Sequence, residues 1–218
     1  MNSTELLETF REEMNDLQTP YLWSDALLYR YINDAQEMFC RRTEGIEDSS
    51  TPRVCRLSIQ SGTEWYEISR KVLKVREAVD VATGRPVPIM NMEKASPKGV
   101  HFDGNPGPLK MFVSGLEKHK LRAWPMPNQA GVVELRVFRL PLETITDDGD
   151  QALEVDEQHH LSLLLWVKHR AYGKEDAETF DRRKADEFES RFYAYCEKAS
   201  REQERARRND GTVMYGGV

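Results

Sequence analysis

Glu157 and His160 have the residue types and the spacing of a metal-binding helix. Di-iron helical proteins need a Glu-x-x-His motif on two helices together with further glutamates, and here the motif occurs once. Acidic residues also complement the positive end of a helix dipole, so we interpret Glu157 as part of an ordinary first turn. An enzyme with a metal or acid–base site at Glu157, His159 and His160 is kept as an alternative.

The other residues that could do chemistry have simpler structural interpretations. The acidic stretch 143–157 contains Asp147-Asp148-Gly149-Asp150, which lacks the pattern of a calcium-binding loop, so a solvated loop is favoured. Aromatic residues in the predicted strands could stack on nucleic acid bases, but such residues are usually core and no basic residues alternate with them. They are Trp65, Tyr66, Phe112 and Trp124. No phosphate loop, nucleophile elbow or zinc-protease helix occurs, and we predict no catalytic residue, cofactor or metal.

Cysteine usage and composition narrow the class of protein further. Cys40, Cys55 and Cys196 are odd in number and form no CxxC pair, which favours reduced thiols in a cytosol-like compartment. The 218 residues carry a net charge of −6, whereas a protein that grips DNA over a wide face is normally basic. The longest apolar run, 163–167, is far shorter than the ~20 residues of a membrane span, and no signal peptide precedes the first helix.

Two helices are predicted before residue 52. Leu6, Leu7 and Phe10 recur at helical spacing behind a capping box formed by Asn2 and Glu5, and the stripe continues through Met14 and Leu17. Pro20 is expected to end that helix, because the residue before proline avoids the helical region. A second helix is expected from the cap at Ser24 to about Arg41.

The middle of the chain reads as a small antiparallel sheet or sandwich. Residues 54–59 and 65–68 alternate in polarity around Ser61-Gly62, which predicts a β-hairpin. A second alternating run, 72–81, turns at Thr83-Gly84 into 86–89. Three more strands are predicted at 109–113, 121–124 and 132–140.

Two further helices are predicted near the C-terminus. The segment up to Gly173 is apolar around its whole circumference between Leu161 and Val167, so it should be buried on all sides. The last helix is expected from about Asp176 to Arg207, with an apolar stripe that ends at Ala199. Four Glu–Arg pairs at i,i+4 spacing support it: Glu178–Arg182, Glu187–Arg191, Glu197–Arg201 and Glu204–Arg208.

The order of these elements predicts an α+β fold. Helices from both ends of the chain should form one bundle, with a small antiparallel β domain inserted and a long C-terminal helix that projects beyond the core. The expected divisions are 1–52 and 142–208 for the bundle helices, 53–141 for the β insertion and 209–218 for an extended tail. The helix end and the tail together suit docking onto another protein. The residues expected to do so are Arg201, Arg205, Arg207, Arg208, Val213, Met214 and Tyr215.

Several segments resemble the head-to-tail adaptor (connector) proteins of tailed bacteriophages. The resemblance begins at Leu22-Trp23-Ser24-Asp25 and continues through Leu28-Tyr29-Arg30-Tyr31-Ile32-Asn33-Asp34-Ala35-Gln36. It includes Arg122-Ala123-Trp124-Pro125-Met126-Pro127, Phe138-Arg139-Leu140-Pro141 and the helical ending from Trp166 to Arg201. These segments span about residues 20 to 205 and consist of packing residues rather than catalytic signatures.

The resemblance implies a structural virion protein without enzymatic activity. Such adaptors form a ring, usually of twelve copies, under the portal, and their C-terminal helix and tail reach onto the portal. The β part meets the next tail component, a nozzle or stopper, and double-stranded DNA passes through the lumen. The protein would be made in the host cytoplasm and located at the head–tail junction of the virion, with no membrane contact. Another neck or tail-completion protein on the same scaffold is the alternative.

Overall fold

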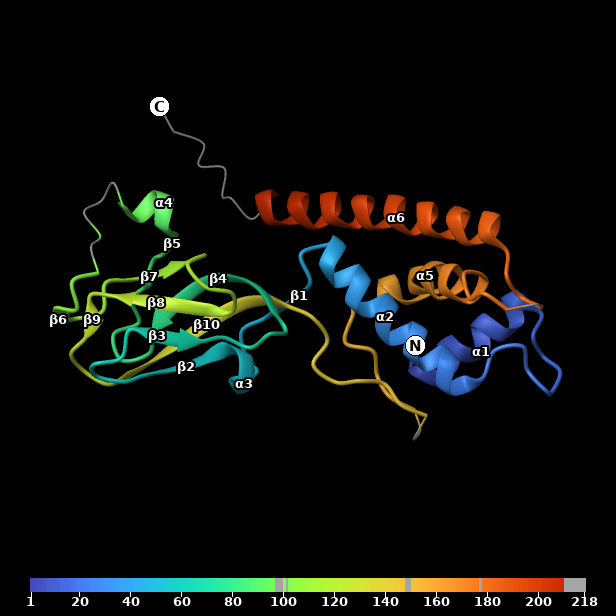
Figure 1. Cartoon of the computed structure of the whole chain (residues 1–218), viewed down its shortest axis with the longest axis horizontal. Helices are drawn as coiled ribbons and strands as arrows, with labels where there is room; N and C mark the ends of the chain where they lie inside the picture. Colours follow the sequence, from blue (N-terminus) through green and yellow to red (C-terminus); the bar gives the residue numbers. More distant parts are fainter. Residues whose placement is uncertain (97–99, 101, 148–149, 177, 210–218) are drawn as a thin grey trace, which may run out of the picture. The chain divides into compact units, whose positions relative to one another are not determined.

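The structure is a computed structural model that describes residues 1–96, 100, 102–147, 150–176 and 178–209 (Figure 1). The chain divides into two compact units. The helical unit consists of Met1–Gly45 and the chain from Pro141 onward, and the β unit is Ile46–Leu140. The presence of both helices and sheets confirms the α+β class. Within the described ranges, no helix has the length and apolar character that crossing a bilayer requires.

Helix α1 (Ser3–Met14) begins at the predicted capping box, in which Asn2 and Glu5 each accept a hydrogen bond from the other's backbone amide. It ends earlier than predicted, because Asn15 adopts the left-handed conformation (φ 55°) and closes the helix well before Pro20. Leu17 therefore lies outside the helix and its side chain is 60% exposed, so its assignment to the apolar stripe was wrong.

Helix α5 (His160–Tyr172) is the central element of the helical unit, preceded by a 3-10 turn at Glu157–His159. It contacts α1, α2 (Asp25–Arg42) and α6 (Arg182–Asn209), and Figure 1 shows it between α6 and the α1–α2 pair. Leu163 and Val167 are fully buried. Leu161 is 59% exposed, so the prediction of burial on every side was wrong at this position.

Helix α6 begins at Arg182, six residues later than predicted. The Asp176 carboxylate accepts hydrogen bonds from the amide and hydroxyl of Thr179 and holds a turn there. Asp181 then caps the helix, because its side chain accepts from the Lys184 amide and its carbonyl accepts from a first-turn amide. Phe180 consequently precedes the helix and is 48% exposed.

The described residues of the β unit form two four-stranded sheets and a two-stranded one. In the first sheet, β10 (Gly131–Arg139) pairs with β4 (Val72–Asp80) along one edge and with β1 (Ile46–Asp48) and β2 (Arg56–Ile59) along the other. The second sheet has the order β3-β8-β7-β5, and β6 pairs with β9. The bounds are β3 Trp65–Glu67, β5 Ile89–Asn91, β6 Pro106–Gly107, β7 Met111–Ser114, β8 Lys120–Trp124 and β9 Met126–Pro127. Two short helices are α3 (Pro52–Cys55) and α4 (Met92–Ala95).

Three details of the predicted β region were wrong. Strands β2 and β3 do not form a hairpin, because the connection between them carries the chain from one sheet to the other. Val54 and Cys55 lie in helix α3, which Pro52 starts at a position where a missing amide is tolerated. The pairs β5–β7 and β6–β9 are parallel, so the β unit is not wholly antiparallel. In addition, β1 lies inside the segment 1–52 that was expected to be helical.

Candidate interaction surfaces

The structure gives Glu157, His159 and His160 separate partners rather than a shared site. Glu157 accepts a hydrogen bond from the N-terminal amine at 2.6 Å, which lowers the pKa of its carboxyl. His159 is buried, its Nδ1 lies 2.8 Å from the Tyr195 hydroxyl, and burial lowers its pKa. His160 Nε2 donates to the Val155 carbonyl at 2.7 Å. Among the described residues, no three His, Cys, Asp or Glu side chains are grouped so as to hold a metal.

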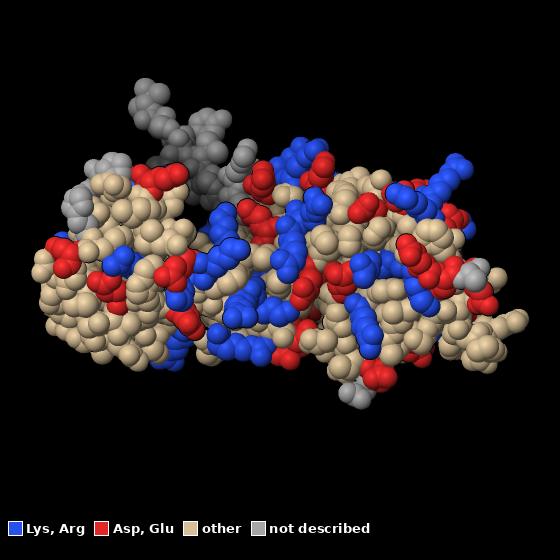
Figure 2. All heavy atoms as spheres, in the orientation of Figure 1, with Lys and Arg blue, Asp and Glu red and all other residues tan. Residues whose placement is uncertain are grey.

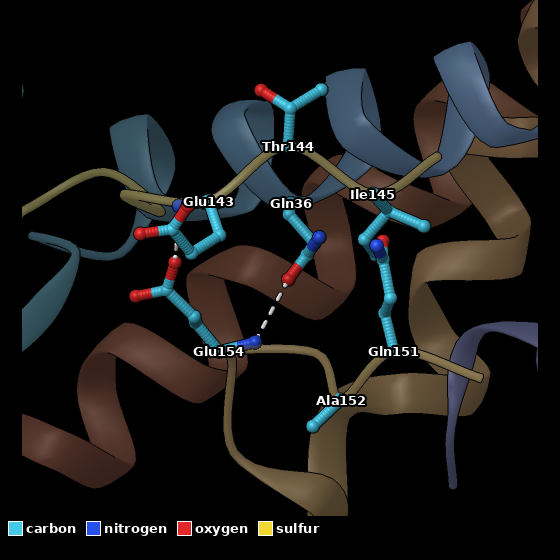
Figure 3. Close-up of a pocket in the computed structure, with 7 residues that line it drawn as sticks. All are labelled: Gln36, Glu143, Thr144, Ile145, Gln151, Ala152 and Glu154. Atoms are coloured by element: carbon cyan, nitrogen blue, oxygen red, sulfur yellow. Dashed lines mark hydrogen bonds between the residues drawn. The ribbon is translucent and has the colours of Figure 1, made fainter. Parts of the chain in front are cut away.

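The acidic stretch before α5 is a loop tied to helix α2. Asn33 donates to the Ile145 carbonyl and accepts from the Ile145 amide, at 2.8 and 2.9 Å. The Glu154 carboxylate accepts from the Leu142 and Glu143 amides, and Gln36 accepts from the Glu154 amide at 3.2 Å (Figure 3). The hollow between these residues, about 310 Å³, is thus lined by side chains that hold the chain's own backbone. We interpret it as scaffold rather than as a ligand site.

All three cysteine thiols are buried and unpaired with one another. Burial raises the pKa of Cys196 to about 12, and burial together with a hydrogen bond to Asp48 raises the pKa of Cys55 to about 11. The thiolate is the reactive form, so we expect Cys40, Cys55 and Cys196 to react with Ellman's reagent at pH 8 at least ~100-fold more slowly in the folded protein than in guanidinium. A thiol that reacts quickly in the folded state would contradict this burial.

Aromatic packing fixes the part of α6 that precedes its exposed end. Trp166 of α5 packs against Phe192, with ring centroids 5.2 Å apart, and Arg42 of α2 stacks on Tyr193 at 4.0 Å. Ala199 is the last buried residue among the α6 side chains that the structure describes. The helix continues for more than two turns beyond it, so its final segment has few packing partners in the described part of the helical unit (Figure 1).

The predicted docking residues lie in or after this final segment. Arg201 and Arg205 are exposed, and Arg201 pairs with Glu197 at 3.2 Å. Arg207 and Arg208 lie within α6, but their side chains are outside the described part. Val213, Met214 and Tyr215 lie outside the described residues. Of the predicted i,i+4 pairs, Glu187–Arg191 and Glu197–Arg201 are present, at 3.8 and 3.2 Å, whereas Glu178 precedes the helix.

The two units carry net charges of opposite sign. The β unit contains 15 Lys and Arg against 10 Asp and Glu, and the rest of the chain contains 16 against 27. On the face that Figure 2 presents, basic and acidic side chains are interspersed over both units. Part of the acidic excess is exposed on α1, at Glu8 and Glu12, and on the loop before α5, at Asp147, Asp150 and Asp156. A polyanion such as DNA is repelled by such a surface.

The sequence reasoning missed two buried arginines that organise the scaffold. Arg11 contacts Asp16 and the Trp23 carbonyl, and Arg139 contacts Asp48. Neither was identified from the sequence, because charged residues are rarely buried. Arg11 follows Phe10 on the apolar side of α1, and this position in the stripe was the available signal.

The described residues thus show an α+β protein whose last helix continues beyond its buried stripe. The chain matches the family model described as SU10 adaptor protein over residues 1–214 and belongs to that family, a family of bacteriophage head-to-tail adaptors. The resemblance seen in the sequence is thereby confirmed, and the protein is a structural protein of a bacteriophage. A comparison with individually curated proteins finds no match.

Proposed function

We propose that the protein forms a ring, of twelve copies by its resemblance to other adaptors, between the portal and the tail nozzle or stopper. Residues 1–52 and 142–208 supply the bundle helices that pack side by side in the ring. The β insertion, 53–141, meets the tail component, and the tail 209–218 reaches onto the portal. DNA passes through the lumen without a catalytic step. The protein is made in the host cytoplasm and is located at the head–tail junction of the virion.

The exposed end of α6 carries this proposal. A helix normally ends where its apolar stripe ends, because packing supplies most of its stability. Here α6 continues past Ala199 on exposed, charged turns that include Arg201 and Arg205. A helix that stays folded beyond its own hydrophobic core is a preformed surface for another protein. Binding to it costs little conformational entropy, because the helix is already ordered. The docking residues are Arg201, Arg205, Arg207, Arg208, Val213, Met214 and Tyr215.

Charge reversal at the end of α6 tests the portal contact. The double variant Arg201→Glu/Arg205→Glu is expected to lower the affinity for purified portal at least ~10-fold. It places two carboxylates where the proposed portal contact needs cations. Deletion of 209–218 is expected to weaken binding in the same direction. The double variant should keep the wild-type melting temperature within a few degrees, because Arg201 and Arg205 are exposed.

The matched control is Arg182→Glu/Arg183→Glu at the other end of the same helix, where both side chains are also exposed. This control should bind the portal as wild type does. Equal loss in both double variants would show a general charge effect and contradict the assignment to the helix end. Binding to isolated tails but not to the portal would favour the alternative of another neck or tail-completion protein.

A further inference from the structure

Two segments of the β unit bring a cluster of basic side chains together around one hollow. They are 64–71, which contains β3, and 117–122, which contains the start of β8. The two segments carry five Lys and Arg against three Glu, a local net charge of +2 in a chain whose net charge is −6. The hollow has a volume of about 410 Å³ and is named here the basic pocket. Its lining residues are Glu67, Ile68, Arg70, Lys118, His119 and Lys120.

The backbone fixes the two segments against each other. Strands β3 and β8 pair antiparallel, with Glu67 directly opposite Lys120 (Figure 1). Next to this ladder, the Ile68 amide donates to the His119 carbonyl at 2.9 Å. His119 adopts the left-handed conformation (φ 57°), which is typical of a tight turn. The basic pocket is therefore built on a strand pair and the turn that precedes β8.

The carboxylates of the basic pocket act on one of its lysines. Lys120 pairs with Glu117 at 2.7 Å and lies opposite Glu67 in the ladder, and both carboxylates raise its pKa. Arg70 and Lys118 are exposed, and neither forms an ion pair with another described residue. Their two charges are therefore available to an anion from outside the chain.

Aromatic rings beside the basic pocket hold further cations in place. Lys120 Nζ and Arg122 Cζ lie 5.9 and 5.1 Å from the centroid of the Trp65 ring. Lys110 Nζ lies 5.5 Å from the centroid of the Trp124 ring. The expectation that no basic residues accompany the strand aromatics was therefore wrong at both tryptophans. Contact with a ring restricts these long side chains, so positive charge is kept close to the basic pocket.

We propose that the basic pocket binds a phosphate group of a duplex DNA backbone, with Arg70 and Lys118 as the residues that contact it. This inference rests on the proposed function, which places DNA beside every copy of the chain. The acidic excess of the chain lies outside the β unit and repels DNA. The basic pocket has the opposite sign of charge, and phosphate is the anion that a duplex presents at every nucleotide.

Duplex DNA is favoured over a single strand, because the neighbouring rings already have partners. Binding of a single strand uses aromatic faces on which bases stack. The Trp65 ring lies against two cations, of which Arg122 also pairs with Glu64 at 2.6 Å, and Trp124 packs against the buried cluster that contains Val113. Phosphate contacts need no free ring and carry no sequence information, so DNA of any sequence can make and break them as it moves.

The test measures duplex binding by the purified full-length protein. The double variant Arg70→Gln/Lys118→Gln removes both free charges at exposed positions, so the fold should be unaffected. The matched control, Arg56→Gln/Arg85→Gln, removes the same charge from two exposed positions of the same unit outside the basic pocket. A fluorescently labelled duplex of mixed sequence is titrated with each protein, and its anisotropy is recorded from about 50 to 200 mM salt. Melting temperatures verify that each variant is folded.

We expect the pocket variant to bind the duplex at least ~10-fold more weakly than the wild type at about 50 mM salt. The slope of log affinity against log salt concentration should become shallower by about 2, because two phosphate contacts are lost. The control should keep the wild-type affinity and slope. Wild-type binding by the pocket variant, equal loss in the control, or no duplex binding by the wild type would overturn the inference.

Two competitors examine the choice of ligand. A single strand of the same sequence that binds more tightly than the duplex would overturn the inference in favour of base stacking. Polyglutamate that displaces the duplex at equal charge concentration would overturn it in favour of an acidic protein partner. A wild-type protein that binds the portal but not the duplex would overturn this inference alone, whereas one that binds the duplex but not the portal would overturn the proposed function.

Discussion

Replacing Arg139 with methionine is expected to lower the free energy of unfolding of the β unit by about 3–5 kcal/mol. Arg139 Nε lies 2.6 Å from Asp48 Oδ2, and both side chains are buried. The second oxygen of Asp48 accepts the amides of Ser50 and Thr51 at 2.9 and 3.0 Å. Removing the guanidinium leaves a buried carboxylate without its counter-ion, at the point where β1 is joined to β10.

Chemical denaturation monitored by circular dichroism measures this effect. Arg136→Met is the control, because Arg136 lies on the same strand but is exposed. Its ion pairs with Glu47 and Glu77, at 4.0 and 3.5 Å, lie at the surface. Exposed pairs of this kind contribute at most about 1 kcal/mol. If the two methionine variants destabilise equally, the special role of the buried pair is refuted.

The same ion pair makes the free energy of unfolding of the β unit depend on pH, with a sign that follows from the pKa of Asp48. Burial by itself raises the pKa of Asp48, but hydrogen bonds from Ser50, Thr51 and Arg139 outweigh it and hold that pKa well below the usual range. A lowered folded-state pKa contributes stability above the unfolded value of about 4, and that stability is lost as the pH falls below it. The variant Asp48→Asn has no carboxyl at this position, so the part of the stability loss at low pH that comes from protonation of Asp48 should be absent.

Replacing Arg11 with methionine is expected to lower the free energy of unfolding of the helical unit by about 3 kcal/mol or more. Arg11 Nη1 lies 2.7 Å from Asp16 Oδ2, and its Nη2 donates to the Trp23 carbonyl and to Asp25. Its guanidinium also stacks on the Tyr21 ring at 3.6 Å. The buried Asp16 carboxylate in turn accepts backbone amides of the connection between α1 and α2, so this connection depends on one arginine.

Tryptophan fluorescence during unfolding is a suitable measurement, because Trp23 packs edge-on against Phe10 in the same region, at a centroid distance of 5.6 Å. Arg30→Met serves as the control. Arg30 is exposed on α2 and has no ion-pair partner in the described ranges, so its loss should change stability by less than about 0.5 kcal/mol. A midpoint for Arg11→Met close to that of the control would contradict the proposed role.

The long helices could be predicted because each one buries a stripe with a 3.6-residue period. The start of α1 directly after Asn2 followed from capping chemistry, and α5 ends before Gly173 as expected. The boundaries at Asn15 and Asp181 could not be predicted with the same success. Each depends on one short polar side chain, and neighbouring prolines or acidic residues offered competing signals.

The pairing of the strands was less accessible from the sequence. Alternation in β10 shows which residues face the core, but it does not reveal that three other strands pair with this one. Such partners are distant in sequence, whereas β2 and β3 are neighbours on either side of the Ser61-Gly62 turn signal, and they were therefore joined as a hairpin. Arg11, Asp16, Asp48 and Arg139 were missed for a related reason, since an ion pair is recognised as buried only once its neighbours are placed. Portal contact by Arg201 and Arg205 stays a prediction.

The β unit begins and ends on paired strands. Ile46 and Arg139 are direct partners in the ladder between β1 and β10, so the polypeptide enters and leaves this unit at adjacent positions. A domain whose two ends lie side by side can be exchanged as a cassette, because the exchange alters the rest of the protein only at the two adjacent connections. Recombination between phages could therefore graft a different β cassette between Gly45 and Pro141 and alter tail compatibility without redesigning the helices that surround the splice points.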